Sequence, residues 1–433
     1  MPFESPTPAP KTIAVIGGGI SGMGAAYNLA QNHRVVLFEA EPSIGGHART
    51  RPAGRNGADL VDTGFIVFNY ANYPHLTALF DELDVPVVKS NMSFGASIDG
   101  GRFEYGLRDL SAIFAQKKNA LNPRYLRMIS DIFKFNSRAL SIAQSDQTMT
   151  VGAMLDKLGV GSWFAERYIL PLSGAIWSTP VEKIMEFPAY AMMQFFENHA
   201  LLSATGQHQW YTVQGGSVEY VRRLEARMLA KGVDIRLNAP VSAVTRQNGQ
   251  VSVTPRGGIE EIFDEVIFAT HSDDTLALLA DARLHEKDLL GAIAYQPNEV
   301  VLHCDTSVMP RSRKCWSSWV YTERSGQASQ QLDLTYWMNS LQPIPKDDPL
   351  FVTLNSTQSI REELIYDQTT LRHPVYDAKA LQAQKLIKLR NGENNTWFCG
   401  AWMKHGFHED GLSSALDVAE QLGTGAALTL AAE

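Results

Sequence analysis

The stretch IAVIGGGISGMGAAYNLAQNHRVVLFEAEPSIGGHART, residues 13–50, carries the clearest structural signal in the sequence. Residues 12–17 form an apolar, β-branched run that ends at glycine, which is typical of a buried parallel strand. A helix rich in small residues is expected at 20–31, and a second strand at 34–38. This order of strand, helix and strand predicts a βαβ unit.

The glycines between the first strand and the helix match the pattern G-x-G-x-x-G. Gly17 allows a tight turn, Gly19 lets the backbone approach a pyrophosphate, and Gly22 lets helix and strand pack closely. The helix N-terminus at Ile20 and Ser21 offers free N–H groups and a positive dipole end to an anion. We interpret the loop as a dinucleotide site, the alternative being a glycine-rich turn of purely structural origin.

The second strand ends at Glu39, where an acidic residue accepts hydrogen bonds from ribose hydroxyls. Ala40 follows, and a second glycine pair, Gly45 and Gly46, comes shortly afterwards with His47. A plain NAD site has no role for this second pair. The run resembles the E-x5-G-G-R-x-x-T segment of the superfamily of FAD-dependent amine oxidases, protoporphyrinogen oxidases and phytoene desaturases.

The resemblance implies that residues 45–50 pass along the pyrophosphate and ribityl chain of FAD. His47 stands where arginine is usual, which weakens a charge contact but leaves the backbone role intact. Arg49, two residues on, is positioned in the sequence to compensate. The resemblance continues at three later places, whose residues it assigns to the flavin, the adenine and the ribityl chain. These are Thr63, Gly64, Phe65 and Ile66, then Val241, then Gly400, Ala401, Asp410, Gly411 and Leu412.

In the last of these places, a glycine at a strand end meets the ribityl chain, and a helix from about Gly411 points its N-terminus at the flavin. The alternative is a capped C-terminal helix with Asp410 near its start. No cysteine occupies an attachment point of the family, since Cys399 precedes Gly400. The resemblance therefore implies FAD bound without a covalent link.

The fold class expected from these motifs is α/β. It comprises a Rossmann-like FAD-binding domain of the GR2 type, assembled from three segments, and a substrate domain of mixed sheet and helix. The FAD domain is predicted at 11–85, 210–272 and 390–433, and the substrate domain at 86–209 and 273–389. Residues 1–10, which hold four prolines, are predicted to be a disordered tail.

The bulk composition excludes several classes of protein. A net charge of −8 argues against nucleic-acid binding, and three widely spaced cysteines suggest neither disulfides nor a zinc site, so no metal is expected. No apolar run reaches the roughly 18–20 residues of a spanning helix. We expect a cytoplasmic protein, with attachment to the inner membrane surface left open.

The substrate is expected to be apolar and derived from lipid. Gly411 aligns with a place where amine oxidases of the family carry a cage aromatic, and large apolar side chains are frequent in the inserts. The ending at 406–415 resembles that of bacterial flavoproteins associated with methylation or cyclopropanation of acyl chains. That resemblance implies desaturation of a methyl-branched fatty acyl chain of membrane phospholipid, towards furan fatty acids.

His408 and Glu409 are the titratable residues nearest the flavin by motif position, so both are predicted to be catalytic, with His405 a further option. Helix capping is the alternative role for Glu409. Rival functions are an amine oxidase, a dehydrogenase of carotenoids or porphyrinogens, and a non-catalytic lipid-binding escort protein. The electron acceptor stays open between oxygen, a quinone and a protein.

Residues 108–138 carry seven basic and two acidic side chains within a chain of net negative charge. Leu126, Ile129, Phe133 and Leu140 recur there at helical spacing. A basic amphipathic helix of this kind lies on anionic membranes. The alternative is a solvated basic face above a stripe of core residues.

Overall fold

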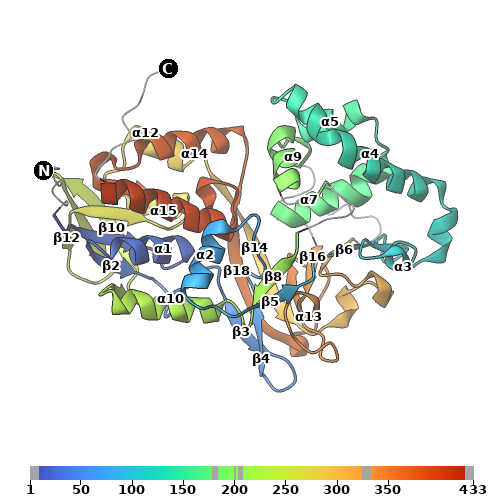
Figure 1. Ribbon diagram of the computed structural model, residues 1–433, viewed down its shortest axis with the longest axis horizontal. Coiled ribbons are helices and arrows are strands. Elements are labelled where there is room, and N and C mark those ends of the chain that lie inside the picture. The colour runs from blue at the N-terminus through green and yellow to red at the C-terminus, as the bar shows by residue number, and fades with distance from the viewer. Residues whose placement is uncertain (1–8, 178–183, 199–200, 203–207, 324–332, 425–433) are drawn as a thin grey trace, which may run out of the picture.

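The computed structural model describes residues 9–177, 184–198, 201–202, 208–323 and 333–424 (Figure 1). Most of the predicted tail, residues 1–8, lies outside this described part. Among the described residues, no helix has both the length and the apolar character needed to cross a bilayer.

A parallel sheet of five strands organises the nucleotide-binding half of the protein, in the order β19-β13-β1-β2-β9. Its strands come from three separated parts of the chain: β1 (Thr12–Ile16), β2 (Arg34–Phe38), β9 (Asp234–Arg236), β13 (Glu265–Phe268) and β19 (Thr396–Phe398). The βαβ unit predicted at the start is confirmed, since α1 (Ile20–Leu29) connects β1 to β2. This Rossmann-like sheet confirms the α/β class.

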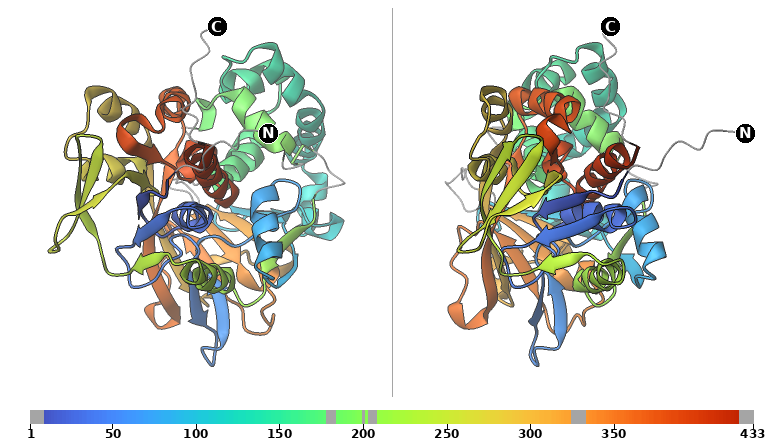
Figure 2. Two further views of the ribbon diagram at one scale, coloured as in Figure 1. Left: turned by 60° about the vertical axis from the view of Figure 1, so that its left-hand side comes forward. Right: turned by 90° about the vertical axis from the view of Figure 1, so that its left-hand side faces the viewer.

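Side chains alternate between the two faces of this sheet, as the period of a strand requires. Ile13 and Val15 pack against one layer of helices: α1, α2 (Pro74–Glu82), α10 (Val218–Ala230) and α15 (His408–Thr424). Ala14 and Ile16 face the other way, towards a small antiparallel sheet and α14 (Ala378–Arg390). That sheet comprises β10 (Val241–Gln247), β11 (Gln250–Pro255) and β12 (Glu261–Phe263), and Figure 2 shows the resulting layers.

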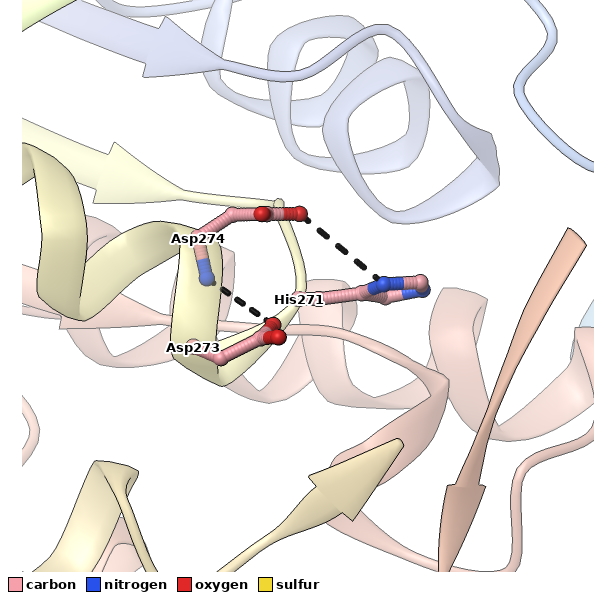
Figure 3. Close-up of side chains that lie close together, drawn as sticks. All are labelled: His271, Asp273 and Asp274. Carbon is pink, nitrogen blue, oxygen red and sulfur yellow. Dashed lines mark hydrogen bonds and ion pairs between the residues drawn. The ribbon is translucent and has the colours of Figure 1, made fainter. Parts of the chain in front are cut away.

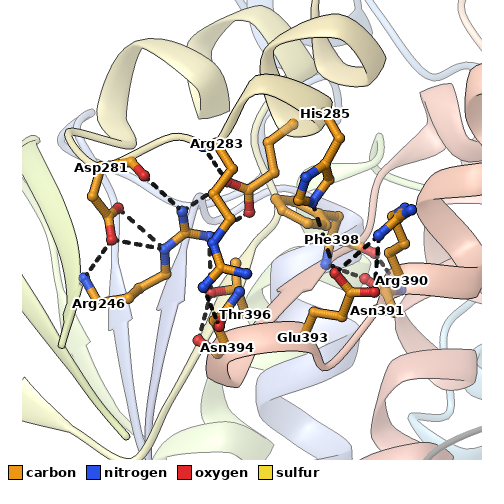
Figure 4. A network of polar contacts seen from close by, with 11 residues as sticks. Arg246, Asp281, Arg283, His285, Arg390, Asn391, Glu393, Asn394, Thr396 and Phe398 are labelled. Carbon is orange, nitrogen blue, oxygen red and sulfur yellow. Dashed lines mark hydrogen bonds and ion pairs between the residues drawn. The ribbon is translucent and has the colours of Figure 1, made fainter. Parts of the chain in front are cut away.

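A buried ion-pair network ties these layers together (Figure 4). Arg246 on β10 is nearly inaccessible and binds Asp281 and Glu286, while its Nη1 also donates to Thr396 on β19. Glu286 lies on α12 (Leu284–Leu290), which follows α11 (Ser272–Leu278). The network therefore holds the end of the parallel sheet to the layer behind it.

A mixed sheet of seven strands forms the other half, in the order β18-β14-β17-β16-β15-β6-β7. A second group of helices packs over its core, at the end of the molecule away from the parallel sheet (Figure 1). The strands are β6 (Phe94–Ile98), β7 (Phe103–Gly106), β14 (Ala294–His303), β15 (Trp319–Thr322), β16 (Asp333–Trp337), β17 (Phe351–Leu354) and β18 (Ile365–Val375). The helices include α4 (Pro123–Ser145), α5 (Val151–Leu158), α7 (Leu170–Trp177) and α9 (Ala189–Asn198).

Short elements complete the fold. They are the hairpin of β3 (Thr50–Ala53) and β4 (Asp59–Asp62), the pair of β5 (Val87–Ser90) and β8 (Trp210–Val213), and the helices α3 (Leu110–Ile113), α6 (Ser162–Phe164) and α13 (Met338–Leu341). The predicted turn at Asn248 and Gly249 is confirmed, with positive φ at both residues. The division into two domains stays a prediction.

One boundary differs from the sequence expectation in a way that affects the site. Helix α15 begins at His408, not near Gly411. The Asp410 carboxylate accepts hydrogen bonds from the backbone N–H groups of His405 and Phe407, which closes the turn ahead of the helix. Glycine is a poor helix former and is therefore expected at a helix end, but Gly411 lies inside the first turn of α15.

Candidate functional site

The glycine loop leaves its backbone open at the one position where the predicted ligand needs access. A Cβ added at Gly22 would lie 1.8 Å from the carbonyl oxygen of Gly17, so this glycine is required for packing α1 onto β1. A Cβ added at Gly19 would meet no atom of the described residues within 4 Å. Gly19 is the N-cap of α1 and has no side chain to cap Ile20 and Ser21. The loop therefore has the form of an anion cradle.

The adenosine end of the predicted site is built by three segments that meet at Glu39. Its carboxylate accepts hydrogen bonds from the backbone N–H groups of Gly18, at 2.7 Å, and Glu41, at 2.9 Å. Ala40 follows on the surface. The backbone N–H of Ala239 donates to the carbonyl of Glu39, which places Val241 at the start of β10 beside it. A carboxylate has about four acceptor positions, so Glu39 keeps capacity for ribose hydroxyls.

The second glycine pair lies against the first. The backbone N–H of Gly45 donates to the carbonyl of Gly18, and Gly46 lies close to the Cα of Gly19. The carbonyl of His47 accepts from the N–H of Phe65 and lies so close to Gly64 that a Cβ there would approach it to 2.1 Å. The predicted flavin segment, with Thr63 bonded to the carbonyl of Arg49 and Ile66 following, is thereby fixed beside the glycine loop.

The expectation that Arg49 replaces the missing arginine at position 47 is wrong. Both terminal nitrogens of its guanidinium bind Asp367 on β18, at 2.5 and 3.0 Å, and one also donates to Thr63. Hydrogen bonds at the carboxylate lower the pKa of Asp367 although its burial opposes this. The Arg49 side chain is thus committed to joining the loop to the mixed sheet.

His408 is the first residue of α15 and packs on the predicted flavin segment. Its ring stacks on Phe65, with ring centroids 4.0 Å apart, and its Nε2 is 2.6 Å from the hydroxyl of Tyr220 on α10. Burial lowers the pKa of His408 to about 3, so the imidazole is neutral at physiological pH. Tyr220, which the sequence reading missed, is completely buried, and burial raises its pKa well above 10.

Glu409 caps a neighbouring helix, which is the alternative role that the sequence offered for it. Its two carboxylate oxygens accept the backbone N–H groups of His75 and Leu76, each at 2.9 Å, in the first turn of α2. Only 8% of the residue is exposed. Asp410 caps its own helix in a similar way through Phe407. Both carboxylates therefore stabilise the start of α15 and the helix beside it.

Gly411 packs α15 against α1 and does not face a substrate. A Cβ there would lie 2.8 Å from the Ser21 Oγ and 3.0 Å from Ile20 Cγ2, and the Leu412 side chain fills the space beside Gly24. The sequence argument against amine oxidation, which rested on Gly411, is therefore corrected. The residue directly before α15 is Phe407, which is aromatic, half-buried and stacked on Phe195.

The strand-end segment before α15 is equally constrained. The Ser414 hydroxyl accepts from the N–H of Gly400, and a Cβ at Gly400 would clash with the Trp402 indole, which donates to the carbonyl of Thr270. Ala401 follows, half-buried. Gly400 and Ala401 thus lie at the end of β19, with the first turn of α15 beside them.

Three histidines meet between the glycine loop and the mixed sheet. The His47 ring centroid is 5.9 Å from those of His271, which follows β13, and His373 on β18. Burial lowers the pKa of all three, to about 4 for His271 and about 3 for His373. All three side chains are partly exposed, although burial is the main cause of their lowered pKa. The cluster lies beside the second glycine pair, because His47 directly follows Gly46.

His271 also lies near Asp273 and Asp274, as Figure 3 shows. Their ligand atoms all lie within 4.8 Å of one another, which is the spacing of a metal site. Arg372 binds both carboxylates, at 2.6 Å for Asp273 and in close contact for Asp274. The guanidinium already neutralises the two acids, so this group is a salt-bridge cluster.

Comparison with known proteins identifies the family. The model of the flavin containing amine oxidoreductase family matches residues 20–349, so the chain belongs to this family. Probable polyamine oxidase 4 of Arabidopsis thaliana is 25% identical over 261 residues, 59% of this chain and 49% of that protein. Hydroxyneurosporene desaturase of Cereibacter sphaeroides is 24% identical over 343 residues, 72% of this chain and 63% of the desaturase.

The chain thus spans about half to two thirds of the length of these relatives. Among solved structures, the fatty acid isomerase of P. acnes that produces CLA has the same fold, with a TM-score of 0.63. It is 15% identical, and the match covers 94% of this chain and 98% of the isomerase. The family is one of flavin-containing oxidoreductases, and FAD is the cofactor that membership of it supports.

The described residues fit this cofactor. Open backbone at Gly19, an uncapped helix N-terminus and the carboxylate of Glu39 match a pyrophosphate and a ribose in order along one edge. The sequence found these residues because they occur in a local motif. It missed Tyr220, His271 and His373, which have no motif and reach the site through tertiary structure.

The histidine cluster is expected to lower the stability of the protein at low pH. Burial lowers the pKa of His373 from about 6.5, its value in an unfolded chain, to about 3, so the unfolded state takes up more protons between these pH values. Its contribution therefore lowers the free energy of unfolding by about 2 kcal/mol as pH falls from about 7 to 5.

Urea denaturation of the wild type and of His373→Gln at these two pH values measures this contribution. We expect the variant to lose less stability on acidification. A control, His285→Gln, alters a histidine outside the cluster and retains the wild-type loss. Identical losses in all three proteins would contradict the assignment.

Proposed function

We propose that the protein removes a hydride from a C–H bond of an apolar substrate. The preferred reaction is desaturation of a methyl-branched fatty acyl chain of membrane phospholipid, a step towards furan fatty acids. The observation that carries the proposal is a set of half-buried aromatic side chains on the mixed-sheet side. Trp319 and Tyr336 form an edge-to-face pair across β15 and β16, and Phe407 stacks on Phe195.

Trp319, Tyr336 and Phe407 pack against the same hydrophobic core as Ile66 of the flavin segment and Leu371 of β18. Burial raises the pKa of the Tyr336 hydroxyl well above its usual range although the residue retains exposed surface. Apolar walls next to the flavin segment favour a substrate whose reacting carbon lies within a hydrocarbon chain.

The named functions of two similar proteins support this choice. One is a desaturase of a carotenoid, hydroxyneurosporene, and the other is an isomerase of fatty acids. Both names describe long apolar substrates. The non-catalytic escort alternative loses its support because the chain belongs to a family of flavin enzymes.

We propose that the cofactor is held by the residues assigned to it from the sequence. Gly19 and the N-terminus of α1 hold the pyrophosphate, Glu39 the ribose, and Val241 the adenine. Residues 63–66 and 400–401 lie along the flavin end. The chemistry that FAD supplies when bound is acceptance of the hydride, which carries the two electrons of the oxidation.

Desaturation also releases a proton from the neighbouring carbon. We propose that His408 accepts it, because its neutral imidazole stacks beside the flavin segment at the start of α15. Tyr220 holds the ring in orientation through its hydroxyl at 2.6 Å. The substrate thus loses one hydride and one proton, and a double bond forms.

An amine oxidase is the second candidate. Phe407 gives the position before α15 an aromatic side chain, and aromatic faces attract ammonium groups. The similarity to probable polyamine oxidase 4 of Arabidopsis thaliana supports this candidate.

Anaerobic mixing with three substrate panels separates the candidates. The panels are phospholipids with methyl-branched acyl chains, carotenoid precursors and amines. We expect the branched phospholipids to bleach the visible absorbance of bound flavin at least about a hundredfold faster than the amines, since two good hydrophobic contacts account for such a ratio. Bleaching by amines alone would remove the lipid proposal.

A further inference from the structure

Residues 110–133 expose an unusual run of large apolar side chains. The exposed fractions are 74% for Leu110, 89% for Leu121, 45% for Leu126 and 59% for Phe133. They lie on α3, on a short 3-10 helix at Lys117–Leu121, and on the first half of α4. These elements are at the end of the molecule away from the parallel sheet (Figure 1). Large exposed apolar groups gathered in one stretch mark an interaction surface.

Helix α4 separates its core residues from this exposed row. Tyr125, Met128, Phe135 and Ala139 are buried and pack into the core. Leu126 and Phe133 are seven residues apart, so they share another side of the helix, which is open to solvent. The alternative in which the apolar stripe covers the core is therefore wrong for these two residues. Ile129 and Leu140 of the same predicted stripe do pack against the core.

Basic side chains accompany the exposed row. Those in residues 108–138 are Arg108, Lys117, Lys118, Arg124, Arg127, Lys134 and Arg138. The two acids of the segment both have partners: Asp109 caps α3, and Asp131 is buried, accepts the N–H of Gly161 and pairs with Arg127. The surface is thus positive although the whole chain carries −8.

We propose that this surface, residues 110–133 with their basic neighbours, docks on an anionic lipid bilayer. Apolar groups next to bases match the two layers of a membrane interface, where acyl chains lie beneath charged headgroups. A nucleic acid would use the bases but not the exposed leucines. The docking stands without the proposed reaction. If both hold, the bilayer is where the enzyme meets its acyl substrate.

Flotation of the FAD-loaded protein with vesicles tests the proposal. One set contains equal parts of phosphatidylglycerol and phosphatidylcholine, and the other phosphatidylcholine alone. We expect binding to the first set only, weakened by salt because the attraction is partly electrostatic. Two variants should lower the bound-to-free ratio at least about tenfold: Leu121→Ser with Phe133→Ser, and glutamate at Lys117, Lys118 and Arg124.

A matched control is Ile259→Ser with Leu284→Ser, whose side chains are 85% and 81% exposed elsewhere on the surface. It should float like the wild type. The FAD content of each variant shows that it is folded. Wild-type protein that fails to float, or equal flotation of all variants, would overturn the docking proposal. Loss of flotation has no bearing on the reaction, which detergent-solubilised substrate tests separately.

Discussion

Replacing Gly19 with alanine lowers the affinity for FAD at least about tenfold, or about 1.4 kcal/mol, while the protein remains folded. A Cβ at this position meets no atom of the described chain within 4 Å, so the folded protein accommodates it. The free space is the space that the pyrophosphate must enter, and an added methyl group keeps the phosphate oxygens from the N–H groups of α1. Titration of the FAD-free protein with FAD measures the loss.

Replacing the neighbouring Gly22 with alanine is expected to lower the stability of the protein itself. Its Cβ would lie 1.8 Å from the carbonyl of Gly17, so Gly22→Ala separates α1 from β1 and lowers stability before any cofactor is added. Gly423→Ala is the matched control, because its Cβ also has open space but lies far along α15. Wild-type FAD affinity in Gly19→Ala would show that the pyrophosphate binds elsewhere.

Replacing His408 with glutamine slows flavin bleaching by the active substrate about a hundredfold or more, which is the usual contribution of a general base. Glutamine retains a partner for the Tyr220 hydroxyl but cannot accept a proton as imidazole does. We expect FAD content to be unchanged. Rapid anaerobic mixing in a stopped-flow instrument measures the rate.

Glu409→Gln provides the contrast, since the sequence assigned both residues to catalysis. Its loss of charge weakens the cap on α2 and costs about 1 kcal/mol of stability, with bleaching slowed less than about threefold. If Glu409→Gln is the slow variant and His408→Gln is not, the roles assigned to the two residues are reversed.

Local motifs predicted the first half of the site well. The glycine loop, the strand that ends at Glu39 and the turn at Gly249 all depend on residues within about 30 positions, which a βαβ unit or a hairpin brings together. The function of these segments depends on backbone conformation, and glycine indicates in the sequence where that conformation is required.

The errors have a common cause in long-range contacts. The sequence predicts Arg49 at the cofactor. Its partner Asp367 comes 318 residues later, and no local pattern in the sequence indicates this contact. Gly411 was read as a substrate position, whereas it is fixed by Ser21 on another helix. Glu409 likewise caps α2, more than 300 positions away in the chain. The sequence marks these residues by their place in a motif, and the tertiary contacts explain the role of each.

The order of the five parallel strands bears on how the protein is made. β1, β2 and α1 leave the ribosome first, whereas β19 and α15, which lie at the sheet edge and against α1, are the last of the described elements. The glycine loop is therefore synthesised long before its neighbouring helix exists. A chain without α15 would leave open the side of α1 at Gly24, which Leu412 covers in the folded protein.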